Sequence, residues 1–342
     1  MLLRSTMKIL LLFLLLLIMV FIFPLRMMSL PDDWILSVKD NVREFVSQQT
    51  KEKSSTTNDV PKSYINDIKL GMTKTAVDKL LGKPQDELTN QYNNSWYVYH
   101  HHFDHFILVS YEKQRVEGIY IVASPFNSIK GVKYGMNEKN VKNILGEPLK
   151  VFNGQDYRLK LDEPHTIIYL NKGVYYTYYF DQHENNKLVG MKVVTQSMEN
   201  QKPRLYANPS DELKKDFETL DYYLINADRV KYGLPALSYH DKISITAFNH
   251  SRDMSEQGYF SHTNLEGLDP FDRMQRDGLH YSVAGENLAY GQVSPIEAHH
   301  GLMNSLGHRK NILNEKFEQV GIGVAFNPEN IPFYTENYIT EN

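Results

Sequence analysis

Residues 303–313 read MNSLGHRKNIL, and with residues 285–289 (GENLA) and 260–262 (FSH) they decide the fold of the C-terminal third of the chain. Each motif places a titratable side chain beside a glycine, serine or asparagine that shapes the local backbone. His262, Glu286 and His308 are too far apart in the sequence to share one helix face or one hairpin, so only a folded domain can bring them together. Two histidines and a glutamate in one cleft could transfer protons, hold a divalent metal or bind a polar ligand.

More motifs surround these three in a fixed order between residues 217 and 339. They are INADR (225–229), GYFSH (258–262), PFDR (270–273), GENLA (285–289), MNSLGHRKNIL (303–313), VGIGV (320–324) and YTEN (334–337). The series resembles the CAP superfamily of cysteine-rich secretory, antigen 5 and pathogenesis-related (SCP-like) proteins, in its cysteine-free bacterial form. The resemblance implies an α+β fold, a three-layer α-β-α sandwich.

Members of this family in animals and plants carry a cleft of two histidines and two glutamates. The resemblance carries over to His262, Glu286 and His308, with Asn287 beside them. The second glutamate is absent, because Ser305 stands at its position. We therefore expect a ligand-binding cleft of His262, Glu286, His308, Asn287 and Ser305, smaller and less acidic than in those relatives.

Three roles for this cleft remain open from the sequence. As a metal site, His262 and His308 would be the ligands, Glu286 would orient one ring, and Zn²⁺ would suit the imidazoles better than Ca²⁺. As a hydrolase, Glu286 would be the base and His308 the acid, which makes these three residues the catalytic candidates. As an architectural feature, the same side chains would satisfy backbone groups. The resemblance implies no single activity, and we favour a binding or interaction module over an enzyme.

The amino-acid composition limits the classes of binding partner and the cellular compartment that we expect. The 342 residues carry a net charge of −4 with no basic stripe, which argues against nucleic acid as a partner. The chain has no cysteine, so disulfides and thiolate metal sites are excluded. Export without disulfides is typical of Gram-positive bacteria. The expected partner is a cell-wall, lipid or peptide ligand, or another envelope protein.

The N-terminus predicts attachment to a membrane. Arg4 and Lys8 precede an uninterrupted apolar run, residues 9–23, and no small-residue cleavage site follows it. We interpret residues 1–25 as an uncleaved signal anchor, a transmembrane helix with the N-terminus in the cytoplasm and the remaining chain extracellular. Cleavage of the same segment would instead give a secreted protein.

An internal repeat organises the region between the anchor and the C-terminal motifs. The pair Gly71-Met72 recurs as Gly135-Met136, and the phrase Leu-Gly-x-Pro recurs at the same offset. Each copy is predicted to hold a short helix and three antiparallel strands. The expected organisation is a stalk and linker (26–63), a two-repeat CAP-associated domain (64–197, copies 64–124 and 128–197), a linker (198–212) and the CAP domain (213–341).

Overall fold

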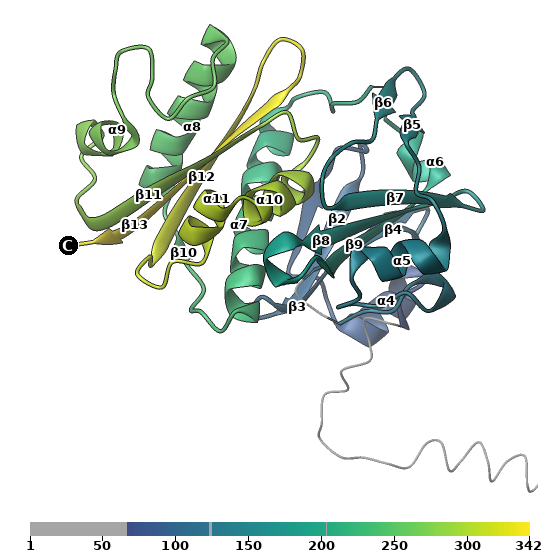
Figure 1. Ribbon diagram of the computed structural model, residues 1–342. Helices are drawn as coiled ribbons and strands as arrows, with labels where there is room; N and C mark the ends of the chain where they lie inside the picture. The colour runs from purple at the N-terminus through teal and green to yellow at the C-terminus, as the bar shows by residue number, and fades with distance from the viewer. Residues whose placement is uncertain (1–66, 123–124, 203) are drawn as a thin grey trace, which may run out of the picture. The chain divides into compact units, whose positions relative to one another are not determined.

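The computed structural model describes residues 67–122, 125–202 and 204–342 (Figure 1). The expected anchor, residues 1–25, and the expected stalk, residues 26–63, lie outside the described residues. Within the described ranges, no helix combines the length and the apolar character needed to cross a membrane.

We call residues 67–202 the N-terminal module. Its helices and strands are α4 (Lys74–Leu81), β1 (Asp86–Thr89), β2 (Ser95–His101), β3 (Asp104–Glu112), β4 (Arg115–Val122), η1 (Ile129–Gly131), α5 (Glu138–Leu145), β5 (Val151–Asn153), β6 (Arg158–Lys160), β7 (Thr166–Asn171), β8 (Val174–Asp181), η2 (Gln182–Glu184), β9 (Lys187–Thr195) and α6 (Gln196–Glu199). Seven strands form one antiparallel sheet in the order β1-β2-β3-β4-β9-β8-β7. The sheet therefore contains strands of both sequence copies, and it has one strand more than the six expected.

The two copies share their local structure at the start of each helix. Gly71 and Gly135 adopt φ of +80° and +81°, a conformation that glycine tolerates best. Thr73 caps α4 and Asn137 caps α5, each by accepting a hydrogen bond from a backbone N–H of the first turn. The extra hairpin β5–β6 belongs to the second copy, whereas the short strand β1 belongs to the first.

We call residues 204–342 the C-terminal module. Its elements are α7 (Asp211–Lys231), β10 (Ser238–Tyr239), α8 (Asp241–Gln257), α9 (Pro270–Arg276), β11 (Tyr281–Tyr290), α10 (Pro295–Asn304), α11 (Leu306–Ile312), β12 (Gln319–Phe326) and β13 (Pro332–Glu341). Four strands form a sheet in the order β10-β12-β13-β11, so β11 is an edge strand.

Successive residues of β12 face opposite sides of the sheet, and each side is covered by a helix. Val320, Ile322 and Val324 are fully buried in a core with Phe217 of α7. Gly321 and Gly323 point to the opposite face, where a Cβ atom would meet the backbone of α8 at 2.3 and 2.0 Å. Helices α7 and α8 therefore cover opposite faces of the sheet, and the module is the predicted α-β-α sandwich (Figure 1).

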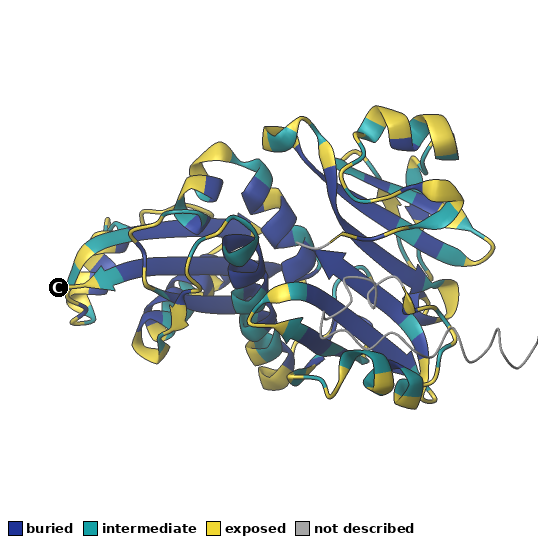
Figure 2. Cartoon of the chain, turned by 90° about the horizontal axis from the view of Figure 1, so that it is seen from below, coloured by how far each residue is buried: buried dark blue, intermediate teal, exposed yellow. Residues whose placement is uncertain are grey.

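A hydrophobic core joins the two modules. Leu220, Leu224 and Ile296 of the C-terminal module pack with Trp96 and Tyr120 of the N-terminal sheet, and all of these side chains are buried. On the N-terminal side of this core, the strands β3, β4, β8 and β9 are buried along most of their length (Figure 2). This shared core fixes the position of α10, which leads directly into the motif containing His308.

Candidate functional site

Glu286 lies at the centre of the predicted cleft and has both oxygens engaged. Its Oε1 lies 2.9 Å from Nδ1 of His262, and its Oε2 accepts a hydrogen bond of 2.7 Å from Arg273. Only 1% of the Glu286 side chain and 4% of the Arg273 side chain are exposed, whereas His262 is 53% exposed. The site is therefore a buried ion pair with an imidazole facing solvent.

The local structure explains how Arg273 reaches Glu286. Asp269 caps α9 with a capping box closed by Asp272, and Pro270 occupies the first helical turn. The guanidinium of Arg273 then donates to the carbonyls of His262 and Leu268, at 2.7 and 2.9 Å. One arginine thus fixes the loop that carries His262 and neutralises the glutamate beside it.

His308 approaches the same place from the other side of the edge strand. It lies on α11, next to β11 through Asn287, whose side chain donates to the His308 carbonyl at 3.2 Å. Burial lowers the pKa of His308 below its usual 6.5, and the neighbouring His262 lowers it further. The His262 ring is thus a near neighbour of the His308 ring.

Asn287 has a structural position beneath the cleft. It is fully buried, donates to Glu336 of β13 at 2.8 Å and accepts from Asn311 of α11 at 2.9 Å. These bonds tie the edge strand β11 to both β13 and α11. Asn287 therefore supports the cleft from below.

Ser305 lines a different cavity. It ends α10 and precedes α11, and its side chain makes no capping hydrogen bond. The cavity has a volume of about 580 Å³ and is shared with His300, Asn304, Tyr179 and Gln182. His262, Glu286 and His308 are not among its lining residues. The structure thus brings His262, Glu286, His308 and Asn287 together, and it places Ser305 against a cavity between the modules.

A second group of buried carboxyls was not foreseen from the sequence. Asp221 of α7 and Glu336 of β13 are both fully buried. Burial raises the pKa of each, and the charge of Glu336 raises that of Asp221 further. Two neighbouring buried carboxyls do not readily ionise together. Because Asn287 and Tyr338 donate to Glu336, this pair stabilises the sheet under the cleft.

The donor set limits the chemistry of the cleft. Among the described residues, no group of three or more His, Cys, Asp or Glu side chains is arranged to hold a metal ion. With Glu286 held by Arg273, a metal at this position would have the imidazoles of His262 and His308 as its protein ligands. Zinc sites normally have three or four such ligands.

Arg273 is the functional residue that sequence reasoning missed. Its signal in the sequence is the motif Pro270-Phe271-Asp272-Arg273. The arginine follows a helix N-terminus by one turn, so its side chain could have been expected to reach back towards the loop that contains His262.

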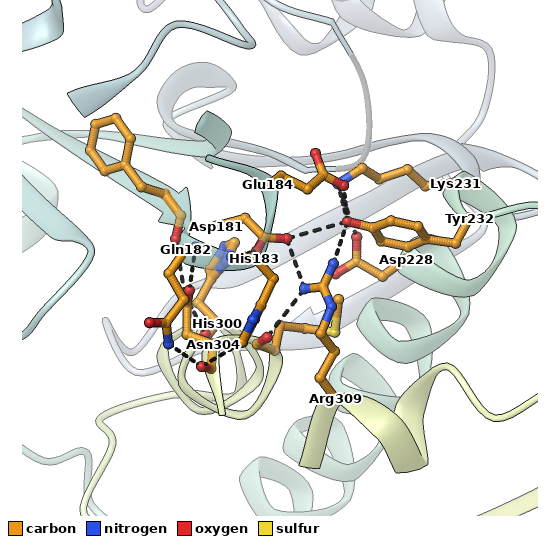
Figure 3. Close-up of polar contacts among 12 residues, drawn as sticks. Asp181, Gln182, His183, Glu184, Asp228, Lys231, Tyr232, His300, Asn304 and Arg309 are labelled. Atoms are coloured by element: carbon orange, nitrogen blue, oxygen red, sulfur yellow. Dashed lines mark hydrogen bonds and ion pairs between the residues drawn. The ribbon is translucent and has the colours of Figure 1, made fainter. Parts of the chain in front are cut away.

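Polar contacts between the modules surround α10 and α11 (Figure 3). Arg309 donates to Asp181 at 2.8 Å and to the Tyr232 hydroxyl at 2.7 Å. Asn304 donates to the Phe180 carbonyl at 2.9 Å and accepts from the Gln182 backbone at the same distance. Because His308 precedes Arg309, these contacts hold the histidine-bearing helix against the N-terminal module.

His300 lies in the same interface and is expected to make stability depend on pH. It stacks on Tyr179 at 4.0 Å between ring centroids and hydrogen-bonds Tyr120 at 2.9 Å. Burial lowers its pKa from 6.5 to about 3. A histidine with a depressed folded pKa contributes its full stability above pH 6.5 and loses it as the pH falls from 6.5 towards 3. At pH 5 the loss is about 2 kcal/mol.

Urea unfolding of wild type and the His300→Gln variant at pH 7.5 and pH 5 measures this loss. The variant cannot titrate and should show a stability difference between the two pH values that is smaller by about 2 kcal/mol. His101→Gln, on an exposed strand end, is the matched control and should behave as wild type. An unchanged pH dependence in His300→Gln would contradict the assignment.

Comparison with known proteins now decides the family. The model of the cysteine-rich secretory protein (CAP) family matches residues 222–338, and the CAP-associated N-terminal model matches residues 70–205. A membrane protein of Bacillus subtilis (strain 168), YlbC, is 30% identical over 293 residues, which cover 79% of this chain and 82% of YlbC. The chain belongs to the CAP family. The resemblance inferred from the motifs is thereby confirmed.

Other relatives agree with the fold of this CAP protein. YkwD of the same organism is 41% identical over 116 residues, covering 34% of this chain and 44% of YkwD. A crystal structure of an extracellular SCP-domain protein from Bacillus anthracis has a TM-score of 0.68 at 21% identity, covering 84% of this chain and 98% of that one. A cysteine-rich secretory protein from Staphylococcus aureus has a TM-score of 0.62 at 17% identity, covering 79% and 93%. These two structures support the fold.

Proposed function

We propose that this chain is an exported cell-envelope protein whose CAP domain acts as a binding module through the cleft of His262, Glu286 and His308. The observation that carries the proposal is the engagement of both Glu286 oxygens, by His262 and by Arg273. The binding surface then consists of the two imidazoles. Its occupant is drawn from the envelope, as a wall, lipid or peptide ligand or a partner protein.

The same observation weighs against a hydrolase. A glutamate base must be free to take a proton from water. Freeing Glu286 would break an ion pair in which both side chains are almost fully buried, and uncoupling such a pair costs about 3–5 kcal/mol. The serine at position 305 also removes the second carboxylate that a paired-carboxylate mechanism would need.

The exposed imidazole of His262 supports a binding role. Its Nδ1 faces Glu286, and within the described residues Nε2 makes no hydrogen bond. Nδ1 of His308 is buried and also has no hydrogen-bond partner among the described residues. A polar ligand, or a divalent metal in the Zn²⁺ alternative, would satisfy these nitrogens.

Zn²⁺ is a direct probe of the two imidazoles. Titration calorimetry with zinc chloride should give a weak signal for the full-length protein, and His262→Ala and His308→Ala should each abolish it, because two ligands are already fewer than usual. Both variants should retain the melting temperature of wild type within a few degrees. His101→Ala, an exposed histidine on β2, is the control for nonspecific zinc binding.

An architectural cleft would give the opposite pattern. Wild type would then bind no zinc, and the alanine variants would melt several degrees lower because buried backbone groups lose their partners. That result would overturn the proposal that the imidazoles bind a ligand.

We further propose that residues 1–25 anchor the protein in the cell membrane with both modules outside. The apolar run and its flanking charges support this, as do a relative named as a membrane protein and a structural neighbour described as extracellular. Protease added to intact protoplasts should digest both modules and leave the N-terminal segment in the membrane fraction. A chain recovered from the medium and beginning near residues 27–30 would contradict the anchor.

A further inference from the structure

A polar cavity of about 260 Å³ shares Arg273 with the cleft. Its walls come from α8, from α9 and from the loop that contains Asn264. His250, Asn249 and Asp253 of α8 and Arg273 of α9 line it. The cavity was not anticipated from the sequence.

Two buried side chains in this cavity have an unpaired nitrogen. His250 is 1% exposed and Arg273 is 3% exposed, yet Nδ1 of His250 and Nε of Arg273 have no hydrogen-bond partner within the described residues. The other nitrogens of these side chains are engaged: Nε2 of His250 with the Ser261 carbonyl at 3.0 Å, and the terminal nitrogens of Arg273 with Glu286 and the His262 and Leu268 carbonyls. Buried polar atoms are rarely left unpaired, so this pair marks a position for a ligand.

The protonation of Nδ1 of His250 and Nε of Arg273 determines which groups can hydrogen-bond to them. The Ser261 carbonyl can only accept, so Nε2 of His250 carries the ring proton. Burial lowers the pKa of His250, so the ring is neutral and Nδ1 is an acceptor. Nε of Arg273 is a donor. A hydroxyl suits either atom, because it can donate to Nδ1 or accept from Nε.

Charge argues against an ionic ligand. The cavity contains three arginines, Arg252, Arg273 and Arg276, and three carboxylates, Asp253, Glu266 and Asp277. Arg276 pairs with Glu266 at 2.8 Å, and Arg273 pairs with Glu286. An anion would face the unprotonated Nδ1 and the carboxylates, and a cation would face the guanidinium of Arg273. A neutral ligand meets neither repulsion.

Further groups around the cavity suit several hydroxyls. The side-chain nitrogens of Asn249 and Asn264 donate no hydrogen bond among the described residues, because the bonds found for these two amides use their oxygens as acceptors. Asp253 receives the Tyr259 hydroxyl on one oxygen only. These groups offer further donors and an acceptor around the unpaired nitrogens.

We propose that this cavity is a saccharide-binding site, in which Asn249 and Asp253 hold sugar hydroxyls and a further hydroxyl completes the hydrogen bonding of His250 or Arg273. The site goes beyond the proposed role of the His262 cleft, since neither His262 nor His308 lines the cavity. It would give an envelope protein a contact to surface glycan.

Saturation-transfer difference NMR on the full-length chain tests the proposal, with N-acetylglucosamine as the probe. The protein is kept in a detergent without a sugar headgroup, because a glycoside detergent would compete. Glycine betaine, which has no hydroxyl, is the comparison ligand. Wild type should saturate the sugar protons and not those of betaine.

Substitutions of cavity residues test whether the sugar binds in this cavity. Asn249→Ala and Asp253→Ala should each weaken sugar binding by about tenfold, the effect of one lost hydrogen bond to a polar ligand. Glu256→Gln, an exposed change on the same helix outside the cavity, should leave it unchanged. Melting curves of all variants confirm that each is folded.

The sugar-binding test of this cavity and the zinc-binding test of the cleft can fail independently. His262→Ala should retain sugar binding whatever it does to zinc, so either proposal can fail alone. No saturation of the sugar by folded wild type would overturn the saccharide site. Equal binding by wild type, Asn249→Ala and Asp253→Ala would also overturn it, since the sugar would then bind elsewhere.

Discussion

An alanine at Gly323 is expected to prevent native folding of the CAP domain. A Cβ atom at this position would lie 2.0 Å from the backbone nitrogen of Phe248 and 2.2 Å from its Cα. Both are backbone atoms of α8, so relief requires the whole helix to move away from the sheet. We expect a loss of more than about 3 kcal/mol, at the upper end for overpacked cores. Guanidinium unfolding followed by circular dichroism, together with the soluble yield, measures it.

Gly301→Ala is the matched control. Gly301 lies within α10, is exposed, and has open space where a Cβ would go. Alanine there should stabilise the protein by about 0.5–1 kcal/mol, because glycine is a poor helix former. If Gly323→Ala were tolerated as well as Gly301→Ala, the close contact of α8 with β12 would be incorrect.

Arg309→Ala is expected to have the second largest effect. Only 5% of the Asp181 side chain is exposed, and Arg309 is its charged partner. Removing the guanidinium leaves a buried carboxylate held by two neutral donors, the His183 backbone N–H at 2.8 Å and the Tyr232 hydroxyl at 3.2 Å. The expected loss is about 3–5 kcal/mol, or a melting temperature lower by about 10 °C.

Arg276→Ala provides the comparison for a lost arginine. Its ion pair with Glu266 has both side chains more than half exposed, and such pairs contribute about 0–1 kcal/mol. Differential scanning calorimetry of the two variants should therefore separate them clearly. Equal melting temperatures would show that the contact between Asp181 and Arg309 does not hold the modules together.

Local patterns explain which elements were predictable. The helix α8, Asp241–Gln257, buries Ile243, Ala247 and Met254 at helical spacing, and Gly258 ends it in a left-handed conformation at φ +70°. The strand β11 was not expected, because the motif Gly285-Glu286-Asn287 lacks strand-forming residues. Its conformation comes from pairing with β13, where Gly285 lies opposite Tyr338. Such long-range pairing leaves no periodic signal in one strand.

The residues of the site likewise differ in whether the sequence could predict their positions. The meeting of His262 with Glu286 followed from the family motifs, and the two side chains are hydrogen-bonded in the structure. The burial of Arg273 did not follow, since it depends on how α9 docks against the loop before it. The place of Ser305 beside the N-terminal module depends on packing between two modules, which motifs of one module cannot encode.

The pairing of the two central strands in the N-terminal sheet bears on how the two sequence copies arose. β4 and β9 run antiparallel, with Gly118 opposite Val194 and Val122 opposite Gly190. Each strand therefore places a glycine opposite a valine of the other, so the pairing is symmetric about its centre. This is the geometry of a two-fold interface between identical subunits. A polypeptide with a single copy would present that strand as an open edge and would associate with a second molecule through it. Duplication within one gene converts this bimolecular association into an intramolecular one, independent of protein concentration. The two halves are then free to diverge.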